Sequence, residues 1–290
     1  MSTQERLPNI LTQVSAELAG KNYVAILGLS GVGKTVLVTL INHALDNYFL
    51  DRYPEITSRI SSGKPFLELC ENNMLDGEFP QRTQPLSRDE IVIQLSRKGM
   101  TGTTSEIRLP DISGEDFNNM CMGDEITGEE RALKVLEMAK PKGKPYGDMG
   151  YVLYAKMYLI LLDCSKSSEW EKLATRHAQA LTTIHEFKEV LKQTRNGKVE
   201  TPIGIILTKA DALPDPDQRA EDAVRSRMRR FLNTLDSIHG GKREFFKLHV
   251  DVERNTDNAI TDPTNLKVRK PLTYSHDEYV RLISWMHENI

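Results

Sequence analysis

Two kinds of apolar segment alternate along the chain: short continuous runs typical of buried strands, and longer stretches with helical periodicity. The strand-like runs lie at 22–27, 90–98, 105–110, 156–164, 202–208 and 244–252. The helical patterns lie at 1–20, from the end of a glycine-rich loop to about 48, and at 128–139, 169–194, 217–238 and 275–290. This alternation predicts an α/β fold of three layers, with a mainly parallel sheet covered by helices on both faces.

The two terminal helices have the clearest signatures. In the N-terminal helix (1–20), Ile10, Leu11, Val14 and Leu18 share one face, and Gly20 ends the pattern. In the C-terminal helix (275–290), Ser275 and Glu278 have the spacing of a capping box.

The whole chain, 1–290, is expected to form a single domain. It has no internal repeat, no low-complexity tract and no Ser/Gly-rich linker. Residues 50–88 are predicted to be irregular, because Pro54, Pro65, Pro80 and Pro85 interrupt any long element.

Composition excludes several classes of protein. The formal net charge is −3 and 27% of the residues are charged, so no electrostatic footprint for nucleic acid is present. The one basic run, RSRMRR at 225–230, is typical of a solvated helix face. The three cysteines form no CxxC pair, which argues against a disulfide framework or zinc site and favours a cytoplasmic location. No signal peptide, membrane span or lipidation motif is evident, so we expect no direct membrane anchor.

The segment GLSGVGKT (28–35) matches G-x-x-x-x-G-K-[ST] and lies between a strand and a helix, as that motif requires. Its glycines let backbone N–H groups surround a phosphate at the positive end of the helix. Lys34 is expected to reach the β- and γ-phosphate oxygens, as a binding and catalytic residue, and Thr35 to ligate Mg²⁺. The expected nucleotide contacts share the loop and the helix start: Gly28, Ser30, Gly31, Val32, Gly33, Lys34, Thr35 and Val36.

Two later segments narrow the choice of nucleotide. In LPDISGEDF (109–117), Asp111 is placed to hold Mg²⁺ through a water, and the Gly114 amide to meet the γ-phosphate. In IILTKADAL (205–213), Asp211 follows a strand whose carboxyl end faces the ligand in an open α/β sheet. A carboxylate there can accept two hydrogen bonds from guanine, from N1–H and from the exocyclic amine, whereas adenine offers no such pair of donors. Asp211 taken alone is equally typical of a helix cap.

With GLSGVGKT, DISG and TKAD in this order, the chain resembles P-loop GTPases of the Ras-like, translation-factor-related class from about residue 22 onward. The resemblance implies a Ras-like G domain that binds GTP and GDP with Mg²⁺, through Thr208, Lys209 and Asp211 on the base side. In that family the lysine of the motif packs along the base, which points to Lys209. PDISGE also resembles divergent prokaryotic GTPases of conflict systems, more weakly.

The chain departs from the family at several positions. Thr101, Thr103 and Thr104 lie too close to Asp111 to supply the switch threonine of the Mg²⁺ site, so Thr83 is expected to do so. Glu115 stands where Ras-like proteins carry glutamine, as a water-positioning group, a proton acceptor or the first residue of a helix. An arginine finger is supplied either in cis by Arg82 or in trans by a partner.

In the family that the chain resembles, a loop after a late strand supplies a third contact to the guanine base. HVDVERN (249–255) lies at that place but does not match the pattern of that loop. Asp251 or Val252 is left to contribute through its backbone. The segments 50–88 and 118–155 enlarge the regions where the switches belong, and we expect a protein effector or complex subunit to bind there.

The favoured function is that of a slow GTPase that acts as a molecular switch. The alternatives are a GTP-binding assembly module with negligible hydrolysis and, less favoured, a P-loop phosphotransferase.

Overall fold

The structure is a computed structural model that describes residues 3–80, 91–98, 104–109, 117, 130, 133, 149–254 and 266–290. The expected helix at 128–139 and most of the 118–155 insertion lie outside these ranges. Among the helices that are described, none is both long and apolar enough to cross a lipid bilayer.

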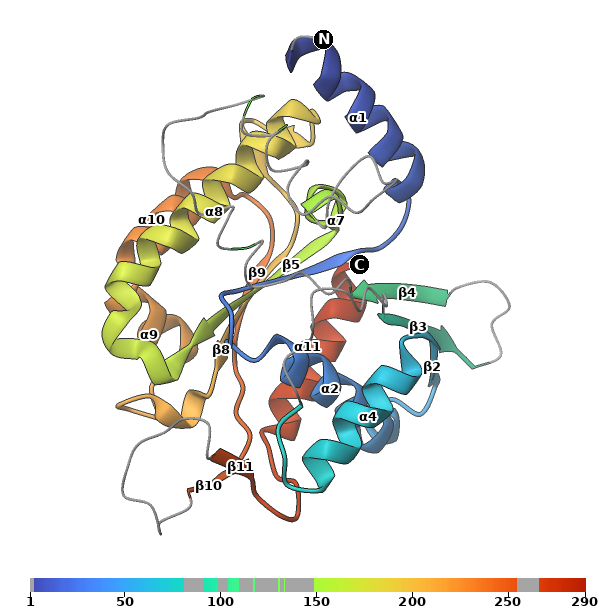
Figure 1. Cartoon of the computed structure of the whole chain (residues 1–290), viewed down its shortest axis with the longest axis vertical. Coiled ribbons are helices and arrows are strands. Elements are labelled where there is room, and N and C mark those ends of the chain that lie inside the picture. Colours follow the sequence, from blue (N-terminus) through green and yellow to red (C-terminus); the bar gives the residue numbers. More distant parts are fainter. Residues whose placement is uncertain are drawn as a thin grey trace.

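Four parallel strands form the centre of the molecule (Figure 1). They are β1 (Val24–Leu27), β5 (Met157–Asp163), β8 (Ile203–Thr208) and β9 (Arg243–Lys247), in the order β1-β5-β8-β9. Every residue of β1, β5 and β8 is buried, as expected for parallel strands with both faces covered. Because the strands run in one direction, their carboxyl ends meet at one edge of the sheet, where Asp163 pairs with Thr208.

Three antiparallel strands extend the sheet beyond β1. They are β2 (Ile56–Ser62), β3 (Ile91–Arg97) and β4 (Thr104–Leu109), in the order β2-β3-β4. β4 is joined to the parallel sheet by a bridge between Tyr23 and Arg108, and the Arg108 N–H donates to the Asn22 carbonyl at 2.9 Å. The two strands expected at 90–98 and 105–110 are therefore confirmed.

Helices cover both faces of the parallel sheet (Figure 1). One core joins α1 (Thr3–Leu18), α7 (Met149–Tyr154), α8 (Trp170–Val190), α9 (Ala220–Arg227) and α10 (Arg229–Ile238) to one face. The other core joins α2 (Lys34–Ala44), α4 (Lys64–Leu75) and α11 (His276–Asn289) to the opposite face. Alternate residues of β5 divide between the two cores, Tyr158 and Ile160 in the first, Leu159 and Leu161 in the second. These three layers confirm the predicted fold class.

Short elements complete the part of the chain that the structure describes. They are η1 (Leu45–Phe49), α3 (Leu50–Arg52), η2 (Cys164–Glu169), η3 (Ala210–Ala212), β6 (Thr194–Arg195) with β7 (Lys198–Val199), and β10 (Val252–Arg254) with β11 (Leu266–Val268). The N-terminal helix is confirmed, with Val14 and Leu18 fully buried and Ile10 and Leu11 packed against the same core.

The prediction that residues 50–88 are irregular was wrong, because β2 and α4 lie within them. The prolines mark the boundaries of these elements. Pro54 precedes β2, and Pro65 occupies the first turn of α4, where a missing N–H costs no helical hydrogen bond. Residues 50–80 thus hold an added strand, β2, and a helix, α4, that packs on α2.

Three predicted boundaries also differ. The helix expected at 217–238 is broken at Met228, whose buried side chain separates α9 from α10. The helix expected at 169–194 ends at Val190, and the strand expected at 244–252 ends at Lys247.

The predicted capping box at the start of α11 does not form. Ser275 precedes the helix without a side-chain cap, and its Oγ accepts the His249 N–H at 3.1 Å. The Glu278 carboxylate accepts the Lys247 N–H at 3.3 Å. The two side chains therefore hold the end of β9 and the segment that follows it, because that edge strand has backbone donors to satisfy.

His177 is a buried titratable group in the core between α8 and α10. Its side chain is 2% exposed, and its ring lies 5.4 Å from the Phe117 ring and 6.0 Å from the Phe231 ring. The Leu173 carbonyl lies 2.9 Å from Nδ1, and since a carbonyl only accepts, Nδ1 carries the proton. Burial lowers the pKa of His177 below its ordinary value, against the opposing effect of this carbonyl.

We predict that replacing His177 by Gln makes folding stability less dependent on pH. As pH falls through about 6.5, the unfolded chain binds a proton at His177 that the folded chain does not, so acid favours unfolding of the wild type. Urea unfolding of both proteins between about pH 7.5 and pH 5.5 measures this. Equal slopes of unfolding free energy against pH would contradict the prediction.

Candidate functional site

The loop from Gly28 to Thr35 joins β1 to α2 through residues with positive φ. Gly31 has φ 78° and Gly33, which precedes the helix, has φ 97°. An L side chain rarely adopts these angles, so glycine is required for the loop to curve. Gly28 is required for another reason: a Cβ there would lie 2.8 Å from Val32 Cγ1 and 3.2 Å from Leu161 Cβ.

The start of α2 is suited to an anion. The first turn contains no acidic residue, and no side chain caps it. Its N–H groups and the positive end of the helix dipole therefore face the loop. Lys34 Nζ donates to the carbonyls of Gly28 at 2.9 Å and Leu29 at 3.3 Å, which keeps the ammonium over the loop. This arrangement is that of a phosphate-binding loop.

The residues expected to touch phosphate occupy this loop and first turn. Val32 is buried, while Ser30, Lys34, Thr35 and Val36 are partly buried.

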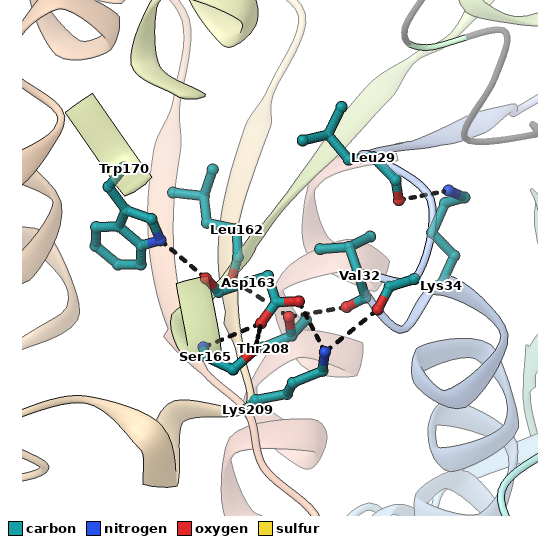
Figure 2. Close-up of polar contacts among 10 residues, drawn as sticks. Leu29, Val32, Lys34, Leu162, Asp163, Ser165, Trp170, Thr208 and Lys209 are labelled. Atoms are coloured by element: carbon teal, nitrogen blue, oxygen red, sulfur yellow. Dashed lines mark hydrogen bonds and ion pairs between the residues drawn. The ribbon is translucent and has the colours of Figure 1, made fainter. Parts of the chain in front are cut away.

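Thr208 connects the end of β8 directly to the phosphate loop (Figure 2). Its Oγ1 lies 2.9 Å from the Val32 carbonyl and 3.3 Å from the Leu162 carbonyl, so its single hydrogen is shared between the loop and β5. In sequence these partners are far apart. The threonine of TKAD thus fixes where the loop lies relative to the base side of the site.

Lys209 adopts the left-handed conformation, with φ 53° and ψ 43°. Its Nζ lies 2.7 Å from Asp163 Oδ2 and 3.3 Å from the Gly31 carbonyl. The lysine stem therefore runs from β8 across the end of β5 to the phosphate loop (Figure 2). The left-handed region is strained for a residue with a Cβ, and these contacts oppose that strain.

Asp163 is a polar residue of the site that the sequence analysis missed. Its side chain is only 7% exposed at the end of β5. Oδ1 accepts hydrogen bonds from the Ser165 N–H at 3.0 Å and Oγ at 2.5 Å, and the Asp163 carbonyl accepts from Trp170 Nε1 at 2.9 Å. The available signal was an aspartate that closes the continuous apolar run YLILLDC, at the strand end where ligands bind.

Asp211 lies in η3, next to the segment that follows β9. The Ala210 N–H donates to the Leu248 carbonyl at 3.1 Å. The exposed Asp211 lines a groove of about 710 Å³ together with Lys247 and His249. Leu248 is thus the residue of that segment that contacts the TKAD turn, and Val252, from which a base contact is expected, lies in β10.

Cys164 is a buried cysteine directly after β5, and nearby charges affect the pKa of its thiol. Burial raises the pKa of its thiol to about 12, and the charges of Asp163 and Asp211 add to this effect. The thiol therefore stays protonated and unreactive.

The structure thus brings Thr208 and Lys209 into contact with the expected loop, and Asp211 follows them in η3. Arg82, Thr83, Asp111, Gly114 and Glu115 lie outside the described residues. Within the described ranges, no group of three or more His, Cys, Asp or Glu residues is arranged to hold a metal ion.

The three-layer fold and the loop at 28–35 are those of a P-loop nucleotide-binding protein. Residues 25–138 match the model of the Double-GTPase 1 family. The matched range covers less than half of the chain; it includes GLSGVGKT and DISG and ends before TKAD. This match agrees with the weaker resemblance to conflict-system GTPases. No curated protein sequence matches the chain.

Two solved structures align with most of the chain. The small COPII coat GTPase SAR1 of Encephalitozoon cuniculi, in complex with GDP, is 13% identical with a TM-score of 0.32, over 99% of this chain and 89% of that chain. The signal recognition particle receptor SRb-GTP/SRX complex of Chaetomium thermophilum is 14% identical with a TM-score of 0.32, over 80% of this chain and 91% of that chain. TM-scores of this size support no inference about ligand or partner.

We predict that Gly33→Ala weakens nucleotide binding while Gly20→Ala does not. Both glycines have positive φ and open space around a Cβ, so each variant loses about 1 kcal/mol of folding stability from backbone strain alone. Only Gly33 lies in the phosphate loop. Titration with a fluorescent GDP, beside urea unfolding, separates the effects, and equal affinities for the two variants would contradict a phosphate-binding role.

Proposed function

We propose that the chain binds GTP and GDP, hydrolyses GTP slowly and changes its affinity for a protein partner with the bound nucleotide. One observation carries this proposal: the TKAD turn is hydrogen-bonded to the phosphate loop. Thr208 reaches the Val32 carbonyl at 2.9 Å and Lys209 reaches the Gly31 carbonyl at 3.3 Å. A nucleotide whose phosphates lie in the loop would therefore have its base beside Lys209 and Asp211.

The residue types on the base side support guanine over adenine. The Asp211 carboxylate would accept hydrogen bonds from the guanine N1–H and the exocyclic amine, whereas adenine has no such pair of donors. The stem of Lys209 would lie along the ring, as the resemblance to the Ras-like class implies. Leu248 and His249 follow β9 beside this position and would supply the backbone contact expected earlier from Val252.

On the phosphate side, the loop amides and Lys34 would bind the β- and γ-phosphates. Mg²⁺, when bound, would neutralise phosphate charge. The Thr35 hydroxyl, in the first turn of α2, fits that ion by residue type and position, and Asp111 and Thr83 are the further ligands that we propose. Gly114 would donate its amide to the γ-phosphate.

Hydrolysis is expected to be slow. Glu115 would position the attacking water or accept its proton, but a carboxylate beside a triphosphate is disfavoured by like charge. Arg82, or an arginine of a partner, would supply the missing positive charge.

The insertion at 50–80 supports a role in partner binding. Its helix α4 packs on α2, the helix that follows the phosphate loop, and it exposes Leu69, which is 61% accessible, and Leu75. Exposed apolar side chains on a helix that packs against α2 offer a surface to which a protein effector would bind.

We predict that Asp211→Asn transfers preference from guanine to xanthine nucleotides. Loss of two charge-assisted hydrogen bonds is expected to weaken GDP binding about 10²-fold or more. The measurement is competition of GDP, GTP, XDP and ATP against a fluorescent GDP in Mg²⁺. Asp217→Asn, in the same exposed loop, is the matched control and should bind GDP as the wild type does. Equal competition by ATP in the wild type would rule out the guanine site.

We predict that purified protein hydrolyses GTP with a rate on the order of 10⁻⁴–10⁻² s⁻¹, the range of G domains without an activating partner. Phosphate release in a single turnover measures it. Glu115→Gln is expected to change this rate while GDP affinity stays the same. A wild-type rate indistinguishable from buffer would favour the alternative of an assembly module without hydrolysis.

Limited proteolysis of the purified protein tests whether the bound nucleotide changes its conformation. Loaded with GDP or with a non-hydrolysable GTP analogue, it should differ in tryptic cleavage within 50–88 or 118–155. Identical cleavage in both states would contradict a nucleotide-dependent surface.

A further inference from the structure

Asp163 is buried at the centre of the site, yet the phosphate and base contacts proposed above do not use it. It ends β5, which lies between β1 and β8, so the carboxylate is placed between the strand that leads into the phosphate loop and the strand that leads into TKAD. Figure 2 shows Lys209 reaching from β8 to this carboxylate.

We propose that Asp163 is a positioning residue that fixes Lys209 in the conformation needed to support the purine ring, and that it thereby sets how long a guanine nucleotide stays bound. This inference rests on the proposed function. Asp163 acts through Lys209 and does not touch the nucleotide itself.

The two carboxylate oxygens of Asp163 have separate partners. Oδ1 accepts the N–H and the hydroxyl of Ser165, which turns the chain from β5 into η2. Oδ2 faces Lys209 Nζ at 2.7 Å. A purely local role in the turn would need only Oδ1, so the Oδ2 contact points to a second task.

Burial makes the contact with Lys209 strong. Asp163 is 7% exposed, and a buried carboxylate without a cation is costly, so the ion pair is held more firmly than one between two exposed side chains. The lysine is 44% exposed, which leaves its stem available to a ligand.

The backbone of Lys209 gives independent support. A non-glycine residue at φ 53° needs surrounding contacts to remain there. Thr208 is tied to Val32, Ala210 to Leu248, and the lysine side chain to Asp163. The first two contacts hold the backbone on either side, and the third sets the direction of the side chain. Without it the ammonium retains only the longer contact to the Gly31 carbonyl.

The main test is the dissociation rate of fluorescent GDP from Asp163→Asn. The amide still offers one oxygen to Ser165 but no charge to Lys209, and we expect dissociation to be about tenfold faster, the size of one charged hydrogen bond. Ser165→Ala is the matched control: it removes a donor to Oδ1 and leaves the Oδ2 contact, so its dissociation rate should stay near that of the wild type. Equal acceleration in both variants would mean that Asp163 only supports the turn.

A second readout separates positioning of the ring from recognition of its edge. Inosine diphosphate lacks the exocyclic amine from which Asp211 would accept a hydrogen bond in GDP. Asp163→Asn should accelerate release of GDP and of inosine diphosphate by the same factor, since the lysine stem contacts the ring. Asp211→Asn should accelerate the release of GDP more than the release of inosine diphosphate. If Asp163→Asn discriminates between the two nucleotides as Asp211→Asn does, the positioning role is wrong.

Variants of the lysine keep the test independent of whether Asp163→Asn folds. Lys209→Met keeps an apolar stem and removes the charge, while Lys209→Arg keeps the ion pair. We expect GDP release to be slower in the Arg variant than in the Met variant, and Asp163→Asn to have no further effect in the Met background. Equal rates of GDP release from the Met and Arg variants would overturn the inference and leave guanine binding intact.

Wild-type protein that binds no guanine nucleotide would overturn the proposed function and this inference with it.

Discussion

The contact between Thr208 and the Val32 carbonyl is the constraint on which the rest of the site depends. β1 and β8 are not neighbours, because β5 lies between them, so the phosphate loop must pass over the end of β5 to reach TKAD. The strand ends therefore act as one unit. The loop contributes backbone carbonyls, β8 contributes Thr208 and Lys209, and β5 contributes Asp163. Each of these groups is held by partners from at least one other strand, which is how a site made of loops acquires a defined geometry.

The parallel sheet makes this possible because both of its faces are buried. Alternate residues of β5 pack into two separate cores, so a one-residue shift in register would move each side chain into the other core and disturb the packing of both. A fixed register places Asp163 level with Thr208 and Leu207 level with Lys247. Beyond β9, the side chains of Ser275 and Glu278 satisfy the backbone of the segment that borders the Asp211 groove. The start of α11 thus forms part of the wall of this groove.

Much of the fold could be predicted, because strongly apolar strands and a phosphate loop leave clear local signals. The errors have physical causes. Pro54 and Pro65 suggested an irregular segment but lie at the boundaries of β2 and α4, where proline is tolerated. The helical pattern at 217–238 continues through Met228, but that residue is buried with a non-helical backbone, φ −121° and ψ 41°, and divides the segment into two helices. Ser275 and Glu278 have capping-box spacing, yet the unpaired donors next to β9 compete successfully for both side chains.

By itself the sequence determined what depends on neighbouring residues. The motif places Gly31 and Gly33 in a tightly curved loop, where both have positive φ. It also places Lys34 and Thr35 at the start of a helix, and Asp211 follows a buried strand. Only the tertiary structure decided which strand ends meet. Asp163 and Lys209 are 46 residues apart, and their ion pair exists because β5 and β8 are adjacent and parallel. Strand order is set by the packing of helices on the two faces of the sheet, which no short segment of sequence encodes.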